Sequence, residues 1–228
     1  MALSKVNFNS MNVTPAASKA IKFNSNNNGL ETGDLGGALV LISEQTASDS
    51  ASIQFTNGID STYKEYIFKY INLHPASDSK TLEFNLSADG GSNYNVTKTT
   101  TFFRAYHDEA GSATSLSYDT GEDLAQGTGD QTLGELIGGD NDQSASGTLR
   151  LFNPSSTTFV KHFIAETSYA QQADYAFRGM MAGYGNTTSS LPSTKDSVDL
   201  ELAVKVLICV NALAAPGTAE IFAMLLLL

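Results

Sequence analysis

Apolar and polar residues alternate along most of the chain beyond residue 36. In residues 81–86, for example, Leu82, Phe84 and Leu86 fall on one face. Alternation with a period of two, rich in aromatic and β-branched side chains, is typical of half-buried β-strands. The pattern therefore predicts strands in residues 38–43, 52–55, 63–73, 81–86, 101–107, 147–152, 158–165, 175–184, 198–206 and 217–222.

Turn residues separate these segments. Asn57-Gly58, residues 88–92 and residues 119–121 supply residue types that tolerate a positive φ, and Pro75 ends the strand before it. Roughly ten strands joined by such turns, without alternating helices, predict an all-β fold. We expect an antiparallel β-sandwich or jelly-roll-like domain spanning residues 36–228.

Residues 1–35 have a different composition. They are rich in Asn and Ser, including residues 24–28, and lack a sustained hydrophobic period. We interpret them as an extended N-terminal arm that contacts a partner. The chain closes on an apolar run, and we expect assembly contacts at both ends. The interface candidates are Val6, Phe8, Val13, Ile21, Phe23, Leu225, Leu226, Leu227 and Leu228.

A long segment at about residues 108–147 is rich in Gly and Asp, and it predicts a loop insertion within the sandwich. Within it, Leu133, Leu136 and Ile137 have the i, i+3, i+4 spacing of a helix face, and Gly138 follows them. One or two helical turns are therefore expected at residues 131–138.

The charge of the chain limits its partners. The formal net charge is −11, and the lysines are scattered singly rather than forming a basic stripe. A nucleic-acid partner is therefore not expected, because phosphate recognition needs clustered cations. The start has no apolar signal region, and the closing leucines are too few to span a bilayer. We expect a protein made in the cytoplasm that has no membrane partner.

Candidate chemistry is sparse. Asp140 and Asp142 lie in a segment that resembles part of a calcium loop but lacks its bidentate Glu, so an Asx-rich turn is the alternative. His74, His107 and His162 are too widely spaced for a compact zinc motif. The single cysteine, Cys209, sits in an apolar stretch typical of a buried position. No catalytic residue, cofactor or enzyme activity is predicted.

Several segments resemble virion proteins encoded by marine tailed phages, over about residues 38–190. The resemblance rests on residues 1–5, 55–66, 71–75, 146–154 and 159–163. It implies a structural role in the particle, as a head decoration protein, a head fibre or a tail fibre. Residues 223–228 depart from the closing pattern of this group, in which the last strand ends on a Leu-Tyr-Gly type sequence.

Two functions follow from these expectations. The first is a capsid decoration or cement protein, a homotrimer whose arm lies on the lattice of the major capsid protein, where many weak contacts add up. The alternative is a tail or head fibre module that binds a host receptor or glycan. Its contacts would come from loops carrying Tyr94, Tyr118, Tyr169 and Tyr184.

Overall fold

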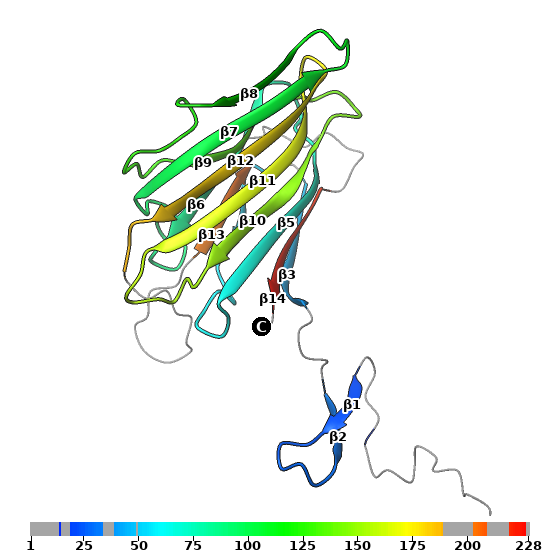
Figure 1. Ribbon diagram of the computed structural model, residues 1–228, viewed down its shortest axis with the longest axis vertical. Coiled ribbons are helices and arrows are strands. Elements are labelled where there is room, and N and C mark those ends of the chain that lie inside the picture. The colour runs from blue at the N-terminus through cyan, green and yellow to red at the C-terminus, as the bar shows by residue number, and fades with distance from the viewer. Residues whose placement is uncertain are drawn as a thin grey trace, which may run out of the picture. The chain divides into compact units, whose positions relative to one another are not determined.

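The computed structural model describes residue 14 and residues 19–33, 39–48 and 50–188, together with the strand backbones of residues 203–208 and 219–226. Fourteen strands and no helix occur in this part of the chain (Figure 1). The sheets are antiparallel and pack together, which confirms the predicted all-β sandwich. The jelly-roll topology and the extended arm stay predictions. The chain divides into two compact units, Met1–Leu39 with Leu227–Leu228, and Val40–Leu226.

The larger sheet of the sandwich contains eight strands, and β7, β12, β11, β10 and β5 run side by side at the front of Figure 1. Some strands pair with the next strand in sequence, such as β11 with β12, whereas β5 pairs with the distant β10 and β14. The strands are β3 (Leu39–Ala47), β14 (Ala219–Leu226), β5 (Glu65–Leu73), β10 (Ala145–Phe152), β11 (Lys161–Gln171), β12 (Tyr175–Gly185), β7 (Lys98–Asp108) and β8 (Thr114–Tyr118).

The smaller sheet lies behind it and contains β9 (Gln131–Ile137), β6 (Lys80–Ser87), β13 (Ala203–Ile208) and β4 (Ile53–Phe55). A single described pair, Gln171↔Ile137, joins the two sheets through their backbones. Side chains from the facing surfaces fill the space between them, as in other sandwiches.

Aromatic side chains dominate this core. Phe84 of β6 packs edge-on against Phe163 of β11, with ring centroids 5.1 Å apart, and so links the two sheets. The alternation predicted these faces correctly, because two sets of residues are buried as expected: Tyr66, Phe68 and Tyr70 on β5, and Leu82, Phe84 and Leu86 on β6.

The segment at residues 108–147 consists mostly of loops, and it also contains two strands, β8 and β9. The predicted helical turns at residues 131–138 are wrong, because β9 occupies residues 131–137. Leu133 and Ile137 are buried against the core, whereas Leu136 is partly exposed with a φ of 53°. A spacing of four residues fits both a helix face and a strand face, and pairing with β6 selects the strand.

The first unit contains a β-hairpin that the sequence did not reveal. β1 (Ala20–Phe23) pairs with β2 (Leu30–Gly33), and the Asn-rich run between them forms the connection. The backbone N–H of Asn24 donates to the carbonyl of Gly29 over 3.0 Å, and Asn27 adopts a φ of 54°. Asn tolerates this left-handed conformation better than most residues, so the run suits a turn.

This hairpin is amphipathic. Phe23 lies opposite Leu30, and both share a face with Ile21 because side chains alternate along a strand. Lys22 and Glu31 lie on the other face and form an ion pair of 3.6 Å. Phe23 is 71% exposed and Ile21 is 40% exposed, so the apolar face of the hairpin is open.

Candidate functional site

The outward surface of the larger sheet carries exposed apolar side chains on neighbouring strands. Ile164 of β11, Phe103 of β7, and Leu116 and Tyr118 of β8 are 51%, 42%, 72% and 42% exposed. Contiguous apolar patches on soluble domains usually mark interaction sites. Single exposed hydrophobic residues are common on protein surfaces and would not indicate an interaction site.

Strand register brings these side chains together. Ile164 lies opposite Ala182, which in turn lies opposite Thr101. Met180 lies opposite Phe103, which in turn lies opposite Tyr118. The rings of Phe103 and Tyr118 meet edge-on with centroids 5.1 Å apart. We call this surface the outer apolar face, and its residues are Phe103, Leu116, Tyr118, His162, Ile164, Met180, Ala182 and Tyr184.

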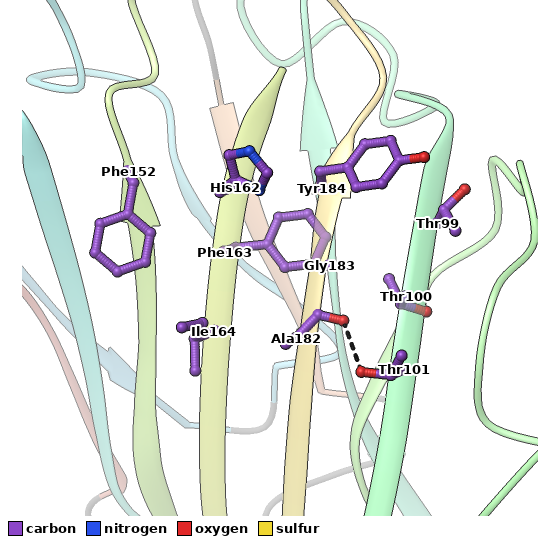
Figure 2. Close-up of a pocket in the computed structure, with 10 residues that line it drawn as sticks. All are labelled: Thr99, Thr100, Thr101, Phe152, His162, Phe163, Ile164, Ala182, Gly183 and Tyr184. Carbon is purple, nitrogen blue, oxygen red and sulfur yellow. Dashed lines mark hydrogen bonds between the residues drawn. The ribbon is translucent and has the colours of Figure 1, made fainter. Parts of the chain in front are cut away.

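A groove of about 480 Å³ opens at one end of the outer apolar face (Figure 2). Its walls come from β10, β11, β12 and β7, and the rings of His162 and Tyr184 lie 6.1 Å apart along one side. A Cβ at Gly183 would lie 2.6 Å from the backbone oxygen of Thr99 and 2.9 Å from the ring of Phe163. Only glycine therefore lets β12 approach its neighbours this closely.

The outer apolar face has no formal net charge. Among the outward residues of β11, β12, β7 and β8, the charged groups are Glu166 and Arg178, which form an ion pair of 2.6 Å. The whole chain carries −11. An apolar, neutral face on an acidic protein can bind another protein by removing apolar surface from water. Its outward side chains offer little that would bind a charged ligand.

Asp108 holds the turn that leads into the edge strand β8. Its carboxylate accepts hydrogen bonds from the backbone N–H groups of Ser112 and Ala113, each over 2.8 Å, and from the Ser112 hydroxyl. These donors favour the charged carboxylate and lower the pKa of Asp108, the Ser112 side chain contributing most. The ionised carboxylate of Asp108 thus stabilises the turn between β7 and β8.

This arrangement predicts how acid affects the turn. Because the folded pKa lies below the unfolded one, the stabilisation is complete above the unfolded pKa and is lost as the pH falls through the folded value. NMR titration of the Ser112 and Ala113 amide signals should give a midpoint below the ordinary Asp pKa. The same signals in Asp108→Asn serve as the control and should not show this transition. A wild-type midpoint at or above the ordinary value contradicts the prediction.

The structure does not bring together the residues considered for metal binding. Among the described residues, no group of three or more His, Cys, Asp or Glu side chains could hold a metal ion. The N–H of Gln143 donates to the carbonyl of Asp140 over 2.8 Å, so Asp140 and Asp142 lie in a turn, as the alternative interpretation expected. His74 contacts the Gln143 carbonyl through Nδ1 at 2.7 Å.

The four tyrosines considered for ligand binding separate into different environments. Tyr118 and Tyr184 lie on the outer apolar face, on strands rather than loops. The Tyr94 hydroxyl donates to Gln54 over 3.1 Å. The placement of Tyr169 in an exposed loop is wrong, because it faces the core on β11 and burial raises the pKa of its hydroxyl.

The interface candidates at the two ends are only partly covered by the structure. Ile21 and Phe23 lie on the open face of the hairpin. Leu225 and Leu226 belong to β14, where the backbone of Leu225 pairs with Tyr66. Val6, Phe8, Val13, Cys209, Leu227 and Leu228 lie outside the described residues.

The sequence contained an unused signal for the outer apolar face. Phe102-Phe103 and Phe163-Ile164 are adjacent apolar pairs within alternating strands. Neighbouring residues of a strand point to opposite faces, so one member of each pair must face outward. Phe102 and Phe163 are buried, and Phe103 and Ile164 are the exposed members.

Comparison with known proteins identified no relative of this chain. No protein-family model, no curated protein and no solved structure matches the chain. In the part of the chain that the structure describes, no helix has the length and apolar character needed to cross a membrane.

Proposed function

We propose that the protein is a non-enzymatic structural component of a virion, a capsid decoration or cement protein that works as a homotrimer bound to the major capsid protein. The observation that carries this proposal is the outer apolar face, because exposed apolar side chains gathered on one surface are typical of a site that binds another protein. The resemblance of residues 38–190 to tailed-phage virion proteins is the reason for proposing that the partner proteins belong to a virion.

A second copy of this chain is the partner that suits the outer apolar face. Copies that each carry −11 repel one another over most of their surfaces. At the outer apolar face this repulsion is weakest, because Glu166 and Arg178 neutralise each other. Burial of apolar area then favours contact between copies at this face rather than elsewhere.

The open hairpin face suits the second contact, with the capsid lattice. A two-stranded hairpin is marginally stable in water by itself. Phe23, Ile21 and Leu30 would gain stability by packing on an apolar depression of the major capsid protein. Each contact is small, but an oligomer presents several hairpins at once, and simultaneous binding raises the overall affinity.

Replacing Phe23 with Ser should release the protein from capsids. Burial of one Phe side chain contributes about 1.5–3 kcal/mol, so each contact should weaken by at least about tenfold. Cosedimentation with capsids of the major capsid protein that lack this chain measures the loss. Lys22→Ser, on the opposite face of the same strand, is the matched control and should bind like the wild type. Equal binding of both variants contradicts the role assigned to the hairpin.

The groove favours a second candidate function, a fibre module that binds a host glycan. Aromatic rings beside a His and Thr hydroxyls are the side chains that sugar rings contact well, and His162 and Tyr184 lie at its rim. Saturation-transfer NMR with the host surface polysaccharide tests this candidate. Transfer that disappears in Tyr184→Ala and persists in Tyr94→Ala supports the fibre function, and absence of transfer to the wild type contradicts it.

A further inference from the structure

Three polar side chains meet inside the sandwich, between the two sheets. Lys98 begins β7 of the larger sheet and is 0% exposed, and Asn85 of β6 in the smaller sheet is 2% exposed. The Nζ atom of Lys98 lies 2.5 Å from Oδ1 of Asn85. Asp130, which directly precedes β9, accepts a hydrogen bond of 2.8 Å from Nδ2 of Asn85. An amine, a carboxamide and a carboxyl group are thus placed in series.

The carboxamide of Asn85 is fixed in position. Its Nδ2 also donates to the carbonyls of Tyr94 and Thr128, over 2.9 Å and 3.2 Å. Its Oδ1 accepts the backbone N–H of Leu86 over 2.8 Å. A donor aimed at this oxygen polarises the carbonyl and would stabilise negative charge that develops on it during nucleophilic attack.

Lys98 has the environment of a nucleophilic amine. Burial lowers its pKa to about 8, against the attraction of Asp130, which acts in the opposite direction. A neutral amine is therefore accessible near physiological pH, and desolvated lysines of this kind act as nucleophiles. The surrounding core excludes water, the main competitor for the carbonyl carbon.

We propose that Lys98 and Asn85 join in an intramolecular isopeptide bond. The neutral Nζ attacks Cγ of Asn85, forming a new C–N bond and a tetrahedral centre. The carboxyl group of Asp130 takes a proton from Nζ and delivers one to Nδ2. The Cγ–Nδ2 bond then breaks and ammonia leaves. The net reaction converts an amine and a carboxamide to a secondary amide and ammonia, without an oxidant or a co-reactant.

The bond would connect the two sheets covalently through β6 and β7. The inference does not rest on the virion function, because it follows from contacts within one chain. A second buried lysine offers a comparison. Lys161 is also 0% exposed, but its Nζ donates to the backbone carbonyls of Ser156 and Phe159, where no carboxamide is available for attack.

Mass spectrometry of the purified full chain tests the bond directly. The intact mass should fall below the sequence mass by one ammonia molecule. Trypsin should then fail to cleave after Lys98, because its side chain is acylated, and should release residues 81–104 as one cyclised peptide in place of residues 81–98 and 99–104. Cleavage after Lys161 in the same digest is the internal control.

Two variants complete the experiment. Asp130→Ala keeps the amine and the carboxamide, and should retain the full mass or lose ammonia more slowly. Lys98→Arg removes the nucleophile and should retain the full mass. A wild-type chain with the full sequence mass overturns the proposal. So does ammonia loss with normal cleavage after Lys98, because a succinimide at Asn85 would give that result.

Discussion

The double substitution of Ile164 and Leu116 by Glu is expected to convert the oligomer into monomers. Both side chains lie on the outer apolar face, where they are more than half exposed in the single chain. Burial of each contributes about 1.5–3 kcal/mol, and every 1.4 kcal/mol is about tenfold in affinity. The added carboxylates also place like charges against an acidic partner, so the loss should reach at least about a hundredfold.

Size-exclusion chromatography with light scattering measures this effect. The wild-type chain should elute as an oligomer, with a trimer expected, and the double variant as a monomer with unchanged circular dichroism. Leu41→Glu is the control, because Leu41 is an exposed apolar residue on β3, at the opposite edge of the same sheet from β8. A wild-type monomer, or a double variant that remains oligomeric, rules out self-association through the outer apolar face.

Replacing Asn85 with Ala should lower the free energy of unfolding by about 3 kcal/mol or more. A crosslink that closes a loop of about 15 residues stabilises a protein by about 3 kcal/mol through the unfolded state. The same substitution removes an acceptor from the buried Nζ of Lys98, which leaves Val96 as its remaining described acceptor, at 2.9 Å. A buried amine that lacks one of its hydrogen-bond acceptors lowers the free energy of unfolding further.

The variant Lys98→Met separates the two contributions. It leaves the hydrogen bonds of Asn85 with Tyr94, Thr128, Asp130 and Leu86 in place. If hydrogen bonding alone acts at this site, replacing the buried amine with an apolar side chain should be nearly neutral. If the isopeptide bond acts, Lys98→Met should lose about 3 kcal/mol. Urea unfolding of the wild type, Asn85→Ala and Lys98→Met supplies the comparison, and a Lys98→Met variant as stable as the wild type contradicts a covalent role.

Alternation predicted the strands that carry a set of large apolar residues on one face. In β6, Leu82, Phe84 and Leu86 face the core, and in β5, Tyr66, Phe68 and Tyr70 do the same. A slip by one residue would move such a set off the core face, so the set fixes one register and one orientation. The all-β class followed from these strands.

Other elements escaped prediction because the local pattern fits more than one structure. The spacing of Leu133 and Ile137 suits a helix as well as a strand, and only β6 as a neighbour decides. β1 and β2 have four residues each, too few to show a period against the polar residues around them.

The chemical site between the sheets could not be predicted from sequence either. Asn85, Lys98 and Asp130 form no motif along the chain, and the packing of β7 against β6 and β9 brings them together. The pairing of β6 with β9 contains register shifts, so the position of Asp130 relative to β6 does not follow from a regular strand pattern. Tertiary packing of this kind lies beyond any local pattern.

The location of the chain in the particle tests the central claim most directly. Cryo-electron microscopy of virus particles purified from cells that express the chain during infection should show many symmetric copies on the capsid surface at threefold or quasi-threefold positions, each with its outer apolar face against another copy. A few copies at the tail or at a single vertex would contradict the decoration function and favour the fibre. Particles that lack the chain altogether would contradict both.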